Sequence, residues 1–302
     1  MHYDDPSLQR SQFRRQLLNP FRTERKEDVE LTLDNNKLSS IFSEVITKFS
    51  EYFFTQLSTS ELSSKDKSVI DWYFEQAIEE TNSLYILAAY TTATNFYAVL
   101  NKGLAKFALK YFDAILQEST KYKAVAAIID FISLLIHDPA LDKYDYRGKT
   151  YRGMLFEKKD FLKYVVGSKL MNISFVSTSK DRNVAEIFAG GVETNLITKA
   201  SEHSCTQISA LCIYMISNAR TGLDIEGISQ ISAEREVLLL PFSAFRIRCI
   251  REMDKTVNNG IAVELELEEC EEHHVESARK KQVRILTHLL RQQQQNNESS
   301  MR

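Results

Sequence analysis

The stretch from Ile231 to Ile247 constrains the fold most, because two glutamates, Glu234 and Glu236, open a strongly apolar run. The run itself, Val237 to Leu240, contains only valine and leucine and predicts a buried strand. In a strand the two glutamates point the same way, about 6 to 7 Å apart along the chain, with Arg235 opposite. The pattern therefore predicts a paired-carboxylate site.

The glutamate pair also has a simpler interpretation. Two acids at the start of an apolar strand are costly unless they meet cations or project into water. For a Glu-x-Glu taken alone, a charged strand entrance that points at solvent is the better interpretation. The motifs upstream of the pair are what favour a functional site.

The chain before this stretch changes from helical to strand-like spacing. Between residues 37 and 140, apolar residues recur at intervals of three and four and predict a helical lobe, whose last helix, Ala124 to Ile136, ends before Pro139. Between residues 141 and 268 short strand-like segments predominate, with two helices at Glu157–Val165 and Asp181–Phe188. The expected strands are Thr150–Met154, Asn172–Ser177, Ser209–Ser217, Val237–Leu240, Phe245–Ile250 and Ile261–Leu267.

These patterns predict an α+β fold, in which an N-terminal helical lobe precedes a mixed or antiparallel, β-sandwich-like core. Residues 1–36 are polar and are expected to form a flexible arm. Residues 269–302 are expected to form a polar, disordered tail, with a short helix at Val283–Leu290.

Composition excludes several classes of partner. The net charge of −3 gives no general attraction to nucleic acid or to anionic membranes. The four cysteines lack metal-ligand spacing, so we expect no metal. The N-terminus lacks an apolar signal core and no run is long enough to span a membrane, so we expect an intracellular, cytoplasmic protein with reduced thiols.

The first upstream motif is Tyr151-Arg152-Gly153. The planar, permanently charged guanidinium of Arg152 suits phosphate or carboxylate, and Gly153 permits a close backbone approach. Taken alone, a Tyr-Arg-Gly is more commonly a surface arginine on an edge strand.

The second motif is Phe175-Val-Ser177-Thr178-Ser179, a strand that ends in three hydroxyl residues. Ser179 or the following Asp181 can cap the next helix. Ser177 is better placed to reach a ligand or to orient a carboxylate. Arginine, then Ser-Thr-Ser, then Glu-x-Glu, in this order, is far more specific than any one part.

Together these motifs resemble the arginine-serine-glutamate class of mono-ADP-ribosyltransferases, which includes cholera-like toxins and the animal arginine-specific enzymes. The resemblance extends from about Tyr85 to Ile250, and the segment from Tyr90 to Asn101 is similar to the helical part of the animal branch. It implies an NAD-binding core and NAD as co-substrate, with NADP as a second possibility. The segment from Gly191 to Gln207, where the family covers the nicotinamide, gives no residue-by-residue match.

The resemblance also implies roles for single residues. Arg152 would hold the pyrophosphate and ribose of NAD, and Ser177 would steady the nicotinamide-ribose region and Glu236, which is essential. Gly153, Thr178 and Ser179 would complete the NAD-binding set. Glu234 would orient a guanidinium, which makes a protein with an exposed arginine the expected partner. The loop from Asp224 to Ser232 resembles the acceptor-recognition turn.

The chemistry suits these residue types, because a fixed carboxylate gains interaction as positive charge develops on ribose during cleavage of the nicotinamide bond. An NAD glycohydrolase needs the same residues, with water as acceptor, and a binding module without turnover is a further alternative. A carbohydrate hydrolase is weaker, since acids two residues apart on one strand do not flank a scissile bond. The chain has no Rossmann or phosphate-loop glycine motif.

Overall fold

The computed structural model describes residues 35–55, 57–112, 127–128, 130–132, 134–136, 138–190, 207–254 and 256–270. The chain separates into two compact units, Met1–Glu269 and Cys270–Arg302, and every element below belongs to the first. The expected arm up to residue 34, most of the segment 191–207 and the tail beyond residue 270, with its short helix, lie outside the described residues.

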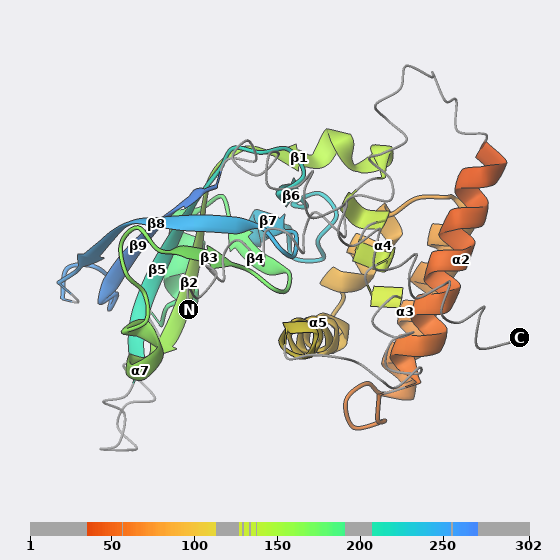
Figure 1. The fold of residues 1–302 in the computed structure, drawn as a ribbon, viewed down its shortest axis with the longest axis horizontal. Helices are drawn as coiled ribbons and strands as arrows, with labels where there is room; N and C mark the ends of the chain where they lie inside the picture. The colour runs from red at the N-terminus through yellow and green to blue at the C-terminus, as the bar shows by residue number, and fades with distance from the viewer. Residues whose placement is uncertain are drawn as a thin grey trace, which may run out of the picture. The chain divides into compact units, whose positions relative to one another are not determined.

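The expected helical lobe is present. It contains α2 (Asn35–Phe54), α3 (Ser64–Glu79), α4 (Leu84–Thr91) and α5 (Phe96–Phe112), which Figure 1 shows as one group, and further helical residues between 127 and 136. Most of the apolar residues described on these helices are buried, and stacked rings join separate helices: the centroids of Phe49 and Phe131 lie 4.0 Å apart. The hydroxyl of Ser63 caps α3 by accepting a hydrogen bond from the Asp66 amide at 3.1 Å.

The second half of the first unit is a mixed sheet, so the α+β prediction is confirmed. Its strands are β1 (Asp145–Tyr146), β2 (Gly148–Glu157), β3 (Lys169–Met171), β4 (Val176–Ser179), β5 (Gln207–Ile216), β6 (Gly222–Asp224), β7 (Glu236–Leu239), β8 (Ala244–Glu252) and β9 (Val263–Glu269). They form a nine-stranded sheet in the order β1-β6-β7-β4-β2-β5-β9-β8-β3. Among the described strands, only the β5–β9 pair is parallel.

The sheet must curl strongly. Strands β7 and β8 are separated in the sheet by β4, β2, β5 and β9, which would place them about 24 Å apart if the sheet were flat. Yet β7 ends at Leu239 and β8 begins at Ala244, a connection that reaches at most about 17 to 19 Å. Val237 and Leu239 of β7 accordingly share a buried cluster with Phe245 and Ile247 of β8. A single curled sheet therefore makes the sandwich-like core.

Strand β7 separates two cores, because successive side chains point to opposite faces. Val237 and Leu239 lie in the core of the curled sheet. Leu238 and Leu240 belong instead to the large cluster that contains the side chains of α2 to α5. Glu236 shares the parity of Leu238, so it lies on the face of β7 that meets the helical lobe.

Two segments differ from the sequence prediction. The expected strand Asn172–Ser177 is irregular up to Phe175, where the side-chain Nδ2 of Asn172 donates to the carbonyls of Leu240 at 2.9 Å and Ser174 at 3.0 Å. The expected helix Glu157–Val165 shrinks to α7 (Lys158–Phe161). Leu162 and Val165, which would extend α7, bury little of their apolar surface, since Leu162 is 73% exposed and Val165 is 60% exposed.

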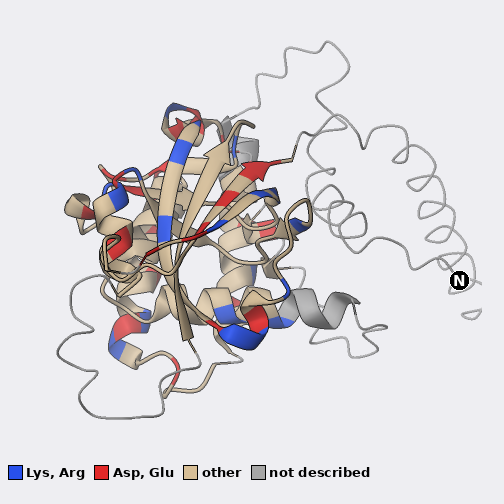
Figure 2. Cartoon of the chain, turned by 90° about the vertical axis from the view of Figure 1, so that its left-hand side faces the viewer, with Lys and Arg blue, Asp and Glu red and all other residues tan. Residues whose placement is uncertain are grey.

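Charged residues of both signs are mixed over the described elements (Figure 2). On β8 and β9, for example, Arg246 lies opposite Glu268 and Arg251 lies opposite Glu264. Such cross-strand pairs support the sheet without creating a field of one sign. Within the described ranges, no helix has the length and apolar character that a membrane span requires.

Candidate active site

The three motifs lie on neighbouring strands. In the antiparallel pair of β4 and β7, Ser179 lies opposite Glu236 and Ser177 lies opposite Leu238. On the other side of β4, Ser179 pairs with Tyr151 of β2. The order β7-β4-β2 thus brings together three segments that are far apart in the sequence.

Arg152 connects the first motif to the second. Its Nη1 donates a hydrogen bond to the backbone carbonyl of Ser177 at 2.7 Å. The Arg152 side chain is partly buried, and its charge acts on Cys212, Tyr90 and Glu236. The guanidinium is therefore held in place by the protein and lies near a buried carboxylate.

Glu236 is that carboxylate, and it is only 6% exposed. Burial is the main cause that raises its pKa above the ordinary glutamate value, and the charge of Glu234 raises it further. Hydrogen bonds from the hydroxyls of Ser177 and Ser229, together with the Arg152 charge, oppose this rise and favour the ionised form. The site thus holds a desolvated carboxylate with two hydroxyl donors and a cation nearby.

Glu234 does not lie on the strand, so the expectation that Glu234 and Glu236 alternate along one strand is wrong. Glu234 ends the short 3-10 helix η2 (Ser232–Glu234), and β7 begins only at Glu236. Between them Arg235 adopts a left-handed conformation, with φ 47° and ψ 48°, which breaks the alternation of a strand. The two carboxylates still interact, since the Glu234 charge acts on the pKa of Glu236.

Backbone contacts join the turn around Glu234 to the end of β4. The Ser179 hydroxyl donates to the Glu234 carbonyl at 2.7 Å, and the Lys180 amide donates to the Arg235 carbonyl at 3.0 Å. These bonds join the turn to the residues that follow β4. The Lys180–Arg235 bond continues the β4–β7 register, in which Ser179 lies opposite Glu236, by one residue pair.

Three residues expected to bind NAD have roles in the framework. The Thr178 hydroxyl donates to the Val237 carbonyl at 2.6 Å, and the Ser179 hydroxyl, besides its bond to Glu234, accepts from the Asp181 amide at 2.9 Å. A Cβ on Gly153 would lie 1.8 Å from the carbonyl oxygen of Ala185. The close backbone approach at Gly153 is therefore that of α8 (Arg182–Phe188).

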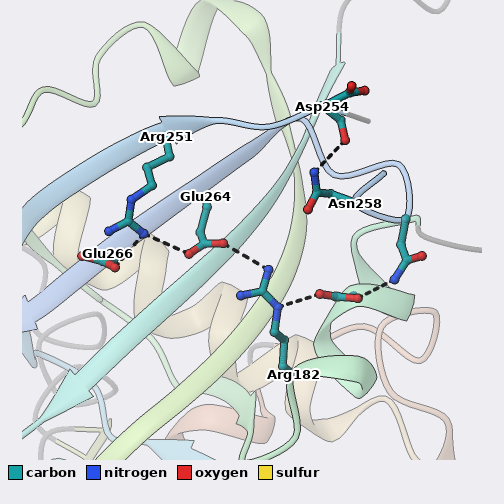
Figure 3. Close-up of polar contacts among 8 residues, drawn as sticks. Arg182, Arg251, Asp254, Asn258, Glu264 and Glu266 are labelled. Carbon is teal, nitrogen blue, oxygen red and sulfur yellow. Dashed lines mark hydrogen bonds and ion pairs between the residues drawn. The ribbon is translucent and has the colours of Figure 1, made fainter. Parts of the chain in front are cut away.

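Helix α8 anchors the Ser-Thr-Ser motif to the sheet. Asp181 caps it by accepting from the Asn183 amide at 2.9 Å, as the sequence allowed, and Gly190 follows its end with φ 90°. Arg182 pairs with Glu264 of β9 at 3.1 Å, and Arg251 of β8 pairs with the same carboxylate at 3.2 Å (Figure 3). This network holds the first turn of α8 to β8 and β9.

Tyr90 and Asn101 lie at the candidate site, although sequence reasoning assigned them no role there. Tyr90 of α4 is 8% exposed, and burial raises the pKa of its hydroxyl, on which the charges of Glu236 and Arg152 also act. Asn101 of α5 donates to the Tyr90 hydroxyl at 2.9 Å and accepts from the Phe175 amide at 3.1 Å. The helical lobe thus reaches the entrance of β4 and the neighbourhood of Glu236. The sequence signal for these two residues was the similarity of the Tyr90–Asn101 segment to the helical part of the animal enzymes. That similarity did not indicate which residues they would contact.

Other candidate chemistry has little support in the described residues. Burial raises the pKa of Cys212 to about 12, so its thiol is a poor nucleophile. Among the residues that the structure describes, no group of three His, Cys, Asp or Glu side chains is placed to hold a metal ion.

No family model and no curated protein matches the chain. Solved structures with similarity include ADP-ribosyltransferase Vis in complex with the M6 inhibitor (18% identity, 82% of this chain and 90% of that chain, TM-score 0.41), a toxin of Vibrio splendidus. The type III effector XopAI of Xanthomonas axonopodis pv. citri has 15% identity over 90% of this chain and 96% of that chain, with a TM-score of 0.48. ADP-ribosyltransferase HopU1 of Pseudomonas syringae pv. tomato has 15% identity over 75% of this chain and 97% of that chain, with a TM-score of 0.43. With identities this low, an activity has to be assigned from the chain's own site residues.

Proposed function

We propose that the chain is a mono-ADP-ribosyltransferase that transfers ADP-ribose from NAD to an arginine of a protein and releases nicotinamide. The observation that carries the proposal is the position of Glu236. The Ser177 hydroxyl lies close enough to this buried carboxylate to favour its ionised form, and the Ser177 carbonyl accepts a hydrogen bond from Arg152. The arginine, serine and glutamate of three separate motifs therefore form one connected group.

Arg152 fits the diphosphate of NAD. A guanidinium has five N–H donors in a rigid fork, and the recorded contact with Ser177 uses Nη1. Within the described ranges, the Arg152 side chain makes no other hydrogen bond or ion pair. The remaining N–H groups of Arg152 can therefore bind phosphate oxygens without first breaking an internal ion pair.

Glu236 fits the ribose end of the co-substrate. A carboxylate shielded from water interacts more strongly with a nearby positive charge than an exposed one does. Positive charge develops on ribose as the bond to nicotinamide breaks, so Glu236 would stabilise the transition state more than the ground state. A carboxylate with this burial also gives a binding module no evident benefit, because its desolvation costs free energy.

Glu234 fits the acceptor. It is partly exposed on the turn before β7, and its charge reaches Glu236. A guanidinium stays protonated at neutral pH, so ion pairing that orients the acceptor is the role assigned to Glu234, rather than full removal of a proton. An acid at this position supports arginine as the acceptor.

The decisive experiment follows nicotinamide release and label transfer from radiolabelled NAD, with and without a free arginine analogue. The parent chain is compared with Glu236→Gln and Glu234→Gln. We expect Glu236→Gln to lose both reactions by about 10²- to 10³-fold, as for removal of one electrostatic stabiliser. We expect Glu234→Gln to lose transfer while it keeps nicotinamide release. A parent chain that binds NAD but releases no nicotinamide would contradict the proposal.

One observation favours NAD glycohydrolase activity as a second candidate. The residue assigned to the acceptor lies on a turn, whereas Arg152, Ser177 and Glu236 lie on strands. If the turn does not hold an acceptor arginine in position, water can take its place as the acceptor. Nicotinamide release without transfer in the parent chain would identify this activity.

A further inference from the structure

The connection between β6 and β7 is a closed turn, here called the acceptor turn and defined as residues 225–235. Its two ends meet, because the Ile225 amide donates to the Glu236 carbonyl at 3.0 Å and Asp224 lies opposite Val237 in the β6–β7 pair. The turn carries Glu234 and also Ser229, whose hydroxyl hydrogen-bonds to Glu236. Its position therefore decides where Glu234 stands relative to the strand residues.

Lys180 holds both ends of the acceptor turn. Its Nζ lies 2.6 Å from Oδ2 of Asp224 and 2.6 Å from Oε2 of Glu226, at the start of the turn. Its backbone amide donates to the Arg235 carbonyl at 3.0 Å, at the end of the turn. A single residue that directly follows Ser179 thus contacts the beginning and the end of the turn.

The Lys180 contacts differ from an ordinary surface ion pair, which contributes little. The Lys180 side chain is 17% exposed, whereas the ion pair of Lys163 with Asp160 has a lysine that is 74% exposed. Burial by itself lowers the pKa of Lys180, but Asp224 and Glu226 more than offset this effect and raise the pKa overall. Lys180 therefore remains a cation at neutral pH, between two carboxylates that would otherwise repel each other.

We propose that Lys180 is a positioning residue for the acceptor step: by holding the acceptor turn, it sets how transfer to arginine competes with hydrolysis. This proposal rests on the proposed transferase function. Bond breaking depends on Arg152, Ser177 and Glu236, whose strands are paired independently of the Lys180 side chain. Loss of that side chain should therefore affect the acceptor more than NAD.

The test compares Lys180→Met and Lys180→Arg with the parent chain, with Lys163→Met as a matched control for removal of a lysine ion pair. The readouts are the ratio of label transferred to nicotinamide released and the KM for the arginine analogue. We expect Lys180→Met to lower the ratio about ten-fold or more and to raise the acceptor KM, since small misplacements of a reacting group are costly. Lys180→Arg should recover most of the ratio, and Lys163→Met should match the parent chain.

A second variant keeps the test valid if Lys180→Met does not fold. Asp224→Asn combined with Glu226→Gln removes both partners of Lys180 and should lower the same ratio. The proposal is overturned if a folded variant of either kind keeps the ratio and the acceptor KM of the parent chain. It is also overturned if the parent chain releases nicotinamide but transfers nothing, an outcome that leaves bond breaking intact. A parent chain without any turnover contradicts the proposed function, and with it the acceptor step assigned to Lys180.

Discussion

Arg152 donates a hydrogen bond from Nη1 to the carbonyl oxygen of Ser177 at 2.7 Å, across 25 residues of chain. The ladder between β2 and β4 has one register pair, Tyr151 with Ser179. The Arg152 side chain therefore adds a second connection between these strands, next to the buried Glu236. The same guanidinium has a structural bond and a proposed binding role, and these can be separated by substitution.

Arg152→Lys is expected to weaken NAD binding about ten-fold or more, because an ammonium cannot hold the Ser177 carbonyl and bind a diphosphate through one planar fork. Isothermal titration with NAD measures the effect. Arg248→Lys is the matched control, since Arg248 is exposed on β8 and pairs with Glu268 at 2.9 Å. Equal affinity of Arg152→Lys and the parent chain would remove Arg152 from the NAD site.

The pH dependence of nicotinamide release should report Glu236. Its pKa is raised, first by burial and then by the Glu234 charge, so activity should begin to fall at a pH above the ordinary glutamate pKa of 4.5 as the pH is lowered. Glu234→Gln removes one of the causes and should move this acid limb to lower pH. An acid limb that does not move in Glu234→Gln would contradict the coupling of the two carboxylates.

The contribution of Glu236 to the free energy of unfolding should fall as the pH rises, whereas nicotinamide release should rise with pH. A raised pKa means that the folded protein holds the Glu236 proton more tightly than the unfolded chain does. The resulting stabilisation is present at low pH and is lost as the pH rises through the folded pKa. Glu236→Gln is therefore expected to melt at a higher temperature than the parent chain at neutral pH, with a difference that closes in acid. Thermal unfolding across that pH range gives the comparison.

Gly153→Ala should displace α8 from β2. The added Cβ would lie 1.8 Å from the Ala185 carbonyl oxygen and 2.4 Å from the Ala189 nitrogen, both backbone atoms that cannot rotate away. We expect a loss of about 1 to 3 kcal/mol or more in the free energy of unfolding, measured by denaturant titration. Gly227→Ala is the control, because a Cβ there meets nothing within 4 Å. Similar stabilities of the two variants would contradict the packing described for Gly153.

Asn101 should couple the helical lobe to β4. Asn101→Ala removes the acceptor of the Phe175 amide and the donor to the Tyr90 hydroxyl, and should cost about 1 to 3 kcal/mol in the free energy of unfolding. Tyr90→Phe removes only the hydroxyl and should cost less. A double-mutant cycle between the two positions measures their coupling, which should be clearly non-additive. Additive losses would show that the hydrogen bond contributes nothing to stability.

Sequence periodicity was enough to predict most of the fold, because burial imposes it directly. The faces built on Phe42, Phe49 and Phe53 are buried in α2, and the expected strand at Val237–Leu240 lies at β7, shifted by one residue. Curling of the sheet was not predictable, since it follows from the pairing order of distant strands. Neither was the contact of Asn101 with Phe175, which joins residues 74 positions apart.

The grouping of the candidate site residues on neighbouring strands was predictable from the sequence, but their local geometry was not. Arg152, Ser177 and Glu236 are connected in the structure, yet Glu234 leaves the strand on which alternation placed it. The cause is the left-handed backbone of Arg235, and arginine is not a residue type that signals this conformation. Bonds from Ser179 and Lys180 hold the turn there, and both come from a different part of the chain.

Because Arg235 has a left-handed backbone, Glu234 belongs to the turn and Glu236 belongs to the sheet. Glu236 shares the rigidity of the sheet, whereas Glu234 follows the turn that ends at Arg235. A change in the sequence of the turn would therefore move the proposed acceptor contact directly, while Arg152, Ser177 and Glu236 keep their places on the strands. The Glu234 charge and the Ser229 hydroxyl, which both act on Glu236, are the links through which such a change would still reach the sheet.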